Sequence, residues 1–333
     1  MGEATADQLP VDASADARAH RGPPSSGRSP RQLAWSRLRR DRVAIASAAV
    51  LTLFVAVALL ADVIAALYGH DKDTTFPELL DVYGYPLGVN GGMSGEHWLG
   101  IEPIIGRDVL LQVVYGTRTS LGIAVVAATV ATMIGAVVGA VAGYLGGRVD
   151  AGVLWCIDVL LAFPFIVFAL AAVPIVNTLV TGTPVLSPAV GTRIATLICV
   201  LIVFGWMGTA RIVRGQVLSL RERQFVDAAR VAGGGARHIV FRELLPNLWG
   251  PIIVTFSLAV PGYVTAGAAL SFLNIGVTEP VPDLGRMIFY SVPYARTDWT
   301  YAFFPGVTLF LIVLAANLLG DSLRDALDPK AIR

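Results

Sequence analysis

Long apolar runs alternate with polar stretches along the chain, and this pattern predicts six membrane-spanning helices. Each run is near or above the about 20 residues that a helix needs to cross a bilayer. The runs are continuously apolar rather than alternating, which favours helices over a β-barrel. The predicted spans are Val43–Tyr68, Ser120–Tyr144, Ala151–Ala172, Ile194–Ala210, Leu248–Leu273 and Tyr301–Gly320. The fold class is therefore predicted to be an all-α membrane protein.

Composition supports this prediction. Of the 333 residues, 55% are hydrophobic and only 15% are charged, against about 25% charged residues in soluble domains. Cys156 and Cys199 both fall inside apolar runs, so they are expected to be small apolar fillers rather than a disulfide. No catalytic or metal-binding residues are predicted.

Arginine is distributed unevenly around the apolar runs. Residues 1–42 lack apolar periodicity and are predicted to be a disordered, arginine-rich tail. The segment Arg211–Asn247 carries seven arginines, whereas the segments 69–119, 173–193 and 274–300 carry few basic residues for their length. By the positive-inside rule, Arg211–Asn247 and both termini are expected in the cytosol. Membrane anchoring explains the basic tail better than a nucleic-acid patch does, so no nucleic-acid partner is expected.

This topology divides the chain into parts. The predicted organisation is a cytosolic tail at 1–42, a first transmembrane helix at 43–68, an extracytoplasmic segment at 69–116, a core at 117–325 and a cytosolic C-terminal tail at 326–333. The core contains a polar loop at 223–246, which we call the elbow.

Glycines recur at four-residue spacing in the second predicted span, at Gly135, Gly139 and Gly143. Small residues on one face let membrane helices approach closely. Close packing against another helix is the expected role, and a glycine-lined substrate path is the alternative.

The third predicted span carries Asp158 and Pro164. A carboxylate in a membrane helix is costly, so Asp158 is expected to face protein or water, in a structural hydrogen bond or a gating role. Pro164 is expected to kink its helix, as are Pro251 and Pro261 in the fifth span.

The elbow is predicted to form a helix–turn–helix. Arg223–Ala232 has helical composition, Gly233-Gly234-Gly235 stops it, and Ala236–Leu245 follows as a second short helix. The apolar side of that second helix is expected to be Ile239, Val240 and Phe241, and Pro246 suits the first turn of the fifth span. Ala228, Ala229 and Ala232 give the elbow a slim face. Either a partner's groove or the lipid headgroups could cover that face.

The spacing of Asp227-Ala228-Ala229, Gly233 and Leu245-Pro246 resembles the EAA loop of ATP-binding-cassette importer permeases, with Asp227 in place of the usual Glu. Other segments resemble the second permease subunit of dipeptide and oligopeptide importers. These are Gly106–Leu110, Tyr115–Leu121, Gly143–Gly147, Asp158–Pro164, Ala269–Leu273, Asn317–Asp321, Leu323–Asp325 and Leu327–Pro329. The resemblance covers the chain from about Leu99 to Pro329.

This resemblance implies a type I importer permease bundle whose elbow is a coupling helix. The implied coupling residues are Phe225, Asp227, Ala228, Ala229, Gly233, Arg237, Leu245 and Pro246. The implied partners are a homologous second permease, two cytosolic ATPases that bind ATP and Mg, and an extracytoplasmic binding protein that delivers a peptide. The implied location is a bacterial inner or plasma membrane.

The chain is not expected to be an enzyme or to bind a cofactor itself. Its only lysines are Lys72 and Lys330, and neither follows the glycine-rich pattern of a phosphate-binding loop. A channel or secondary transporter is a distant alternative, because Asp62 and Asp158 have no acidic counterpart in the second half.

Two further groups of residues are functional candidates. The pathway or gating candidates are Asp158, Pro164, Ser271 and Phe272, and the binding-protein contact candidates are Arg107, Asp108, Glu279, Asp283 and Arg286. A structural role is the alternative for the second group, because Arg107-Asp108 is expected to begin a short outer helix with Asp108 near its positive N-terminus.

The sequence departs from the family pattern at several positions. Ile101-Glu102 stands where Thr-Asp is usual, and Trp155 replaces the Arg that usually accompanies Asp158. The remaining departures are Gly234-Gly235 for an Ala-Ser type pair, which is expected to loosen the turn, Gly267 for Glu, and Glu279, Asp283 and Leu284 for Pro, Ser and Trp. The solute is therefore open: peptide import leads, and a metal chelate or another bulky solute is the alternative.

Overall fold

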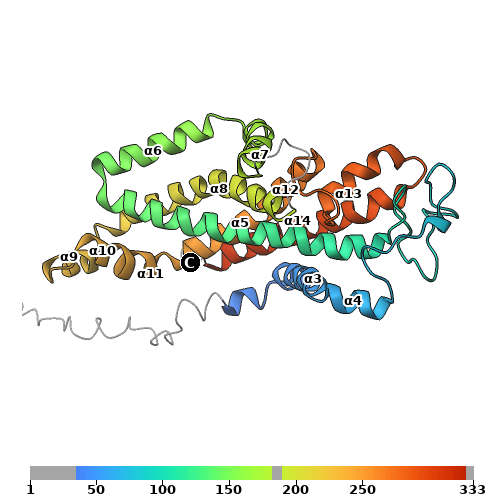
Figure 1. Ribbon diagram of the computed structural model, residues 1–333. Helices are drawn as coiled ribbons and strands as arrows, with labels where there is room; N and C mark the ends of the chain where they lie inside the picture. The colour runs from blue at the N-terminus through green and yellow to red at the C-terminus, as the bar shows by residue number, and fades with distance from the viewer. Residues whose placement is uncertain (1–34, 182–189, 328–333) are drawn as a thin grey trace, which may run out of the picture.

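The computed structural model describes residues 35–181 and 190–327 and is an elongated helical bundle (Figure 1). Within these ranges no strand forms, and the extended pairing is limited to isolated bridges such as Thr75 with Arg107. The helices are α3 (Arg42–Leu59), α4 (Ala61–Tyr68), η1 (Pro77–Leu79), α5 (Val109–Leu145), α6 (Gly147–Leu161), α7 (Phe165–Thr181), α8 (Val190–Leu220), α9 (Gln224–Val231), α10 (Ala236–His238), η2 (Ile239–Leu244), α11 (Leu245–Asn247), α12 (Trp249–Phe272), α13 (Leu284–Ser291), η3 (Val292–Tyr294) and α14 (Trp299–Leu327). The predicted tails lie largely outside the described residues, which exclude 1–34 and 328–333.

The predicted all-α membrane fold is confirmed. Five helices in the described ranges are long and apolar enough to cross a membrane, namely α3, α5, α8, α12 and α14, and the bent pair α6 and α7 makes a sixth if the two together form one span. The third span was predicted to be one kinked helix, but the structure has two. α6 ends at Leu161, α7 starts at Phe165, and the bend between them is 88°. Pro164 sits in this break, where its missing N–H ends the helical hydrogen bonding. By contrast, α12 continues through Pro261.

Two predicted boundaries also change. The fourth span was expected at Ile194–Ala210, but α8 continues to Leu220, past the arginines that end the apolar run. These arginines pair with acids on α6: Arg211 with Asp158, and Arg214 with Asp150. A helix needs only its backbone hydrogen bonds, so a polar turn does not end it. The predicted boundary at 116–117 falls inside α5, which begins at Val109.

The glycine row on α5 packs against α8. A Cβ at Gly135 would lie 2.5 Å from the carbonyl oxygen of Trp206, and one at Gly143 would lie 3.0 Å from that of Arg214. Gly139 approaches the backbone of Ala210 more closely still. Small residues at these positions bring the two backbones together, so the glycines serve close packing rather than a substrate path.

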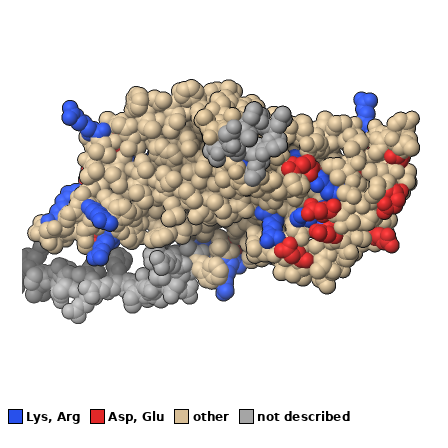
Figure 2. Space-filling model, in the orientation of Figure 1, with Lys and Arg blue, Asp and Glu red and all other residues tan. Residues whose placement is uncertain are grey.

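The bundle carries a different structure at each end. Figure 1 places α9, α10 and α11 at one end of α5 and the loop that precedes α5 at the other. We call this second end the cap and define it as residues 69–108 together with 274–298. Acidic side chains gather toward the cap, whereas basic ones lie at both ends, the elbow end included (Figure 2).

Candidate functional site

The first arm of the elbow is α9, and a hydrogen-bonded turn ends it. Gly233 has φ +83°, and its N–H donates to the carbonyl of Arg230 at 3.0 Å. The N–H of Gly234 donates to the carbonyl of Ala229 at 2.9 Å, which completes a Schellman motif. A Cβ at Gly234 would lie 2.7 Å from that same carbonyl oxygen. Gly234 was expected to loosen the turn, but it instead permits a close backbone contact.

The second arm of the elbow runs through α10, the π-helical η2 and α11. It buries Ile239, Val240 and Leu244. These residues form one apolar cluster with Val226 of α9, with residues 213 and 217 of α8 and with residues 136 and 140 of α5. Phe241, expected on the buried side, is 47% exposed, so that prediction was wrong. The wider π-helical turn brings 239, 240 and 244 to the inner face and leaves 241 outside.

The outer face of the elbow holds most of the predicted coupling residues. Asp227, Ala228, Gly233, Arg237 and Pro246 are exposed, whereas Phe225, Ala229 and Leu245 are half-buried against the apolar cluster. The neighbouring Val231 is 90% exposed. The elbow therefore rests on protein through one face and presents small, apolar and charged side chains on the other.

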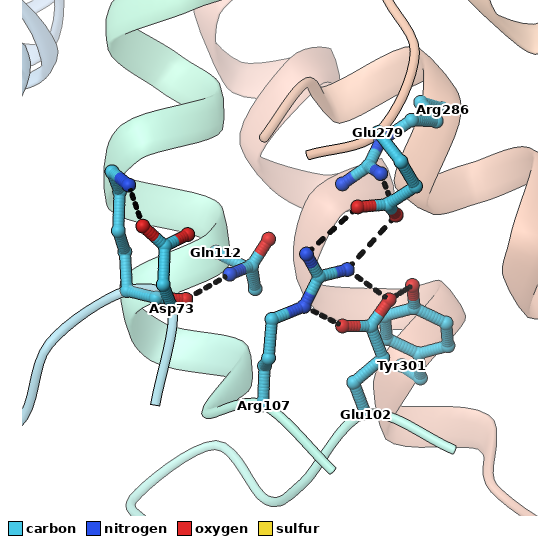
Figure 3. Close-up of polar contacts among 8 residues, drawn as sticks. Asp73, Glu102, Arg107, Gln112, Glu279, Arg286 and Tyr301 are labelled. Carbon is cyan, nitrogen blue, oxygen red and sulfur yellow. Dashed lines mark hydrogen bonds and ion pairs between the residues drawn. The ribbon is translucent and has the colours of Figure 1, made fainter. Parts of the chain in front are cut away.

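An ion-pair network organises the cap around Arg107 (Figure 3). The Nε of Arg107 donates to Glu102 Oε2 at 2.7 Å, and its Nη1 donates to Glu279 Oε2 at 2.8 Å. The hydroxyl of Tyr301 donates to Glu102 Oε1 at 2.6 Å, and Arg286 pairs with Glu279. The network joins the loop before α5 to the loop before α13 and to the start of α14.

All members of this network except Glu279 are buried. Arg107 is 4% exposed and Arg286 is 1% exposed, and burial lowers the pKa of the Arg286 guanidinium while Glu102 opposes that shift. Sequence reasoning missed the network, although Glu102 and Glu279 both stood out as departures from the family pattern. The structure brings these two acids onto one guanidinium.

Two aspartates in the cap region are the N-cap residues of helices. Asp108 accepts the N–H of Leu111 at 3.1 Å as the N-cap of α5, and its other oxygen lies 2.8 Å from His97 Nδ1. Asp283 accepts the N–H of Arg286 at 3.0 Å as the N-cap of α13. Side-chain caps satisfy otherwise unpaired N–H groups of the first helical turn. Burial raises the pKa of Asp283.

The comparisons with known proteins identify the family. Residues 131–333 match the binding-protein-dependent transport system inner membrane component, and residues 29–81 match the N-terminal transmembrane domain of oligopeptide transport permease C. The chain belongs to this permease family. The predicted ATP-binding-cassette importer permease is thereby confirmed, and the permease is a membrane transport component rather than an enzyme.

Several curated relatives align with the permease over most of its length. It is 37% identical over 311 residues to the glutathione transport system permease protein GsiD of Shigella flexneri, covering 92% of the permease and 93% of that protein. It is 35% identical over 303 residues to the dipeptide transport system permease protein DppC of Alkalihalophilus pseudofirmus, covering 91% and 90%. It is 34% identical over 303 residues to DppC of Bacillus subtilis, covering 91% and 86%.

Four of the five predicted binding-protein contacts are buried in the permease. Arg107, Asp108, Asp283 and Arg286 each have less than a twentieth of their surface exposed, and only Glu279 reaches the surface. The prediction was wrong for these four, because their polar atoms are turned inward to bind one another and the helix starts. The short outer helix predicted after Asp108 is instead α5, which has 37 residues.

The pathway candidates do not converge on one site. Pro164 lines a groove of about 560 Å³ between the α6–α7 break, α8 and α12. Phe272 lines a separate groove of about 370 Å³ beside α13. Ser271 is buried, and its hydroxyl accepts the N–H of Val277 at 3.2 Å. Asp158 pairs with Arg211 of α8. This arginine is its partner in place of the Arg that the family usually carries at the position of Trp155.

Proposed function

We propose that the permease is one of two membrane subunits of a peptide-importing ATP-binding-cassette complex in a bacterial inner or plasma membrane. The names of its relatives support a short peptide, because a dipeptide and the tripeptide glutathione share that chemistry. Similar identities to both kinds of relative do not favour one over the other.

Coupling through the elbow is the mechanism that the geometry supports best. The observation that carries it is the division of the elbow into a buried apolar floor and an exposed slim face at Ala228. The floor seats the elbow on α5 and α8, so a force on the exposed face passes to both long helices. We infer that the exposed face sits in a groove of a cytosolic ATPase, which supplies ATP and Mg binding.

Charge supports the orientation with the elbow and both termini in the cytosol. Acids gather toward the cap in Figure 2, and the segment Arg211–Asn247, which contains the elbow, carries seven arginines. Cytosolic segments of membrane proteins are enriched in basic residues. The cap then faces outward, where the binding protein arrives. Its exposed apolar side chains Val82, Tyr83 and Val89 offer a docking surface in place of the buried arginines.

Reconstitution of the complex tests this proposal. The permease, its second permease, the ATPases and the binding protein are placed in proteoliposomes, and uptake of dipeptides, glutathione and a metal chelate is compared. Ala228→Trp adds bulk to the exposed elbow face and is expected to abolish ATPase association and uptake. Ala151→Trp, at an exposed alanine in α6, is the control and is expected to retain both.

Unchanged association and uptake in Ala228→Trp would refute coupling through this face. Uptake of the metal chelate without any peptide would refute peptide import while leaving the importer assignment intact.

A further inference from the structure

The groove at the α6–α7 break has the dimensions of a small-ligand site. Its volume of about 560 Å³ lies within the about 300–1,000 Å³ of typical ligand pockets. Phe163 and Pro164 line it from the break, Phe204 and Gly205 from α8, and Tyr263 from α12. Interrupted helices within a membrane are tolerated where they line a cavity or pack in protein. The break in the third span is therefore accounted for by this groove, because the residues of the break line it.

Tyr263 is the polar exception in this groove. Its side chain is only 8% exposed, and its hydroxyl has no hydrogen-bond partner among the described residues. The other lining residues are apolar side chains or glycines, and none is charged. Buried tyrosine hydroxyls usually find a partner, and an unpaired one costs about 1–3 kcal/mol. A ligand that brings a hydrogen-bond acceptor would remove that cost.

Gly205 makes room for this hydroxyl. A Cβ at Gly205 would overlap the Tyr263 hydroxyl and ring, so the phenol reaches from α12 to the backbone of α8. Apolar packing alone holds the phenol across the groove, because no hydrogen bond fixes its hydroxyl.

We propose that this groove is a subsite for the transported peptide, in which the Tyr263 hydroxyl donates a hydrogen bond to a peptide carbonyl or carboxylate. Phe163 and Phe204 receive an apolar side chain of the same peptide. The absence of charged residues from the lining predicts a preference for peptides with apolar side chains over charged ones. This inference rests on the proposed peptide import and adds where the permease contacts its substrate.

Tyr263→Phe in the reconstituted complex removes the hydroxyl and leaves the ring. The KM for uptake of an apolar dipeptide is expected to rise about fivefold to tenfold, as loss of one hydrogen bond of typical strength produces. Stimulation of the ATPases by the loaded binding protein is expected to stay unchanged, because docking precedes passage through the groove. Tyr290→Phe, which removes a hydroxyl outside this groove, is the matched control and should leave KM unchanged.

Photo-cross-linking identifies the occupant. Benzoylphenylalanine in place of Phe163, which is half exposed in the groove, is expected to form an adduct with a dipeptide during turnover. An adduct with phospholipid alone would overturn the proposal in favour of a lipid-filled groove. An unchanged KM in Tyr263→Phe would also overturn it. Neither result would bear on the proposed peptide import, which fails if the wild-type complex imports no peptide.

Discussion

The elbow and the cap are two ends of the same helices, yet different forces hold them. The elbow is seated by an apolar cluster that includes Val226, Ile239 and Leu244, and its polar side chains point to solvent. The cap reverses this arrangement: Arg107, Glu102 and other charged groups are buried, while Val82 and its apolar neighbours are exposed.

This difference has a physical consequence. Apolar contacts are non-directional, so the elbow can keep its seat while its helices shift slightly. A buried ion pair depends on geometry, and removing one partner leaves an uncompensated charge. The cap is therefore expected to hold one arrangement of its loops, whereas the elbow is expected to tolerate movement of what it touches.

The largest expected effect is in the cap. Arg107→Met removes the guanidinium that pairs with Glu102 and one of the two guanidiniums that pair with Glu279. Breaking a buried ion pair in this way costs about 3–5 kcal/mol. Thermal melting of the purified permease in detergent is expected to show a large loss of stability. Adding Glu102→Gln to Arg107→Met is expected to recover part of that loss.

Arg118→Met is the control for this prediction. Arg118 pairs with Asp62, and both side chains are about half exposed or more, so the expected loss is at most about 1 kcal/mol. Equal losses in the two variants would mean that the buried network contributes no more than a surface pair.

The next effect is in the elbow. Ile239→Ala empties a fully buried position in the apolar cluster, and such changes cost about 2–5 kcal/mol. Co-purification of the ATPases is expected to fall, while the cap stays folded. Phe241→Ala, at an exposed position of the same arm, is expected to have a much smaller effect on elbow stability. If both substitutions disturb the elbow equally, its seat is not the apolar cluster.

A smaller effect is expected at the turn of the elbow. Gly233→Ser places a side chain at φ +83°, which costs about 1–2 kcal/mol for residues other than glycine. Trypsin cleavage at the flanking Arg230 and Arg237 is expected to accelerate about 5-fold to 30-fold. Gly235→Ser serves as the control, because Gly235 is extended, has open space and caps α10, where serine is favourable. Acceleration in the control alone would contradict the Schellman turn.

The smallest effect concerns pH at the cap. Burial raises the pKa of folded Asp283 above its unfolded value, so the folded state holds the proton more tightly. Its contribution to stability therefore falls as the pH rises from the unfolded to the folded pKa. Asp283→Asn keeps an N-cap acceptor and is expected to flatten this dependence in melting curves recorded at several pH values. A steeper dependence in the variant would reverse the assigned direction.

The sequence predicted the structure well where a local residue pattern determines it. The apolar runs located the spans, and the glycine row marked the α5–α8 contact. Gly233 fell at the turn expected of it, although Pro246 lies in α11 and not in the first turn of α12 as expected. Where these predictions held, the chemistry of one residue or one repeat restricts the conformation or the packing of the backbone.

The sequence was a poor guide where distant residues decide the outcome. Arg107 and Glu279 are separated by 172 positions, so no pattern shows that they bind each other. The exposed charges expected in the outer loops were instead inward-facing partners. The extent of the break at Pro164 also depends on the helices around it, because a proline fixes only where hydrogen bonding stops.

The length of α5 has a mechanical consequence. Its 37 residues span about 55 Å at 1.5 Å per residue, which exceeds the about 40–45 Å of a whole bilayer. Asp108 is the N-cap at one end of this helix, and the other end packs against the apolar cluster that holds the elbow. A tilt of about 10° pivoting at the elbow would sweep the outer end through about 10 Å. The helix is thus a lever arm, and a small angular step at one membrane surface becomes a displacement wider than a peptide backbone at the other.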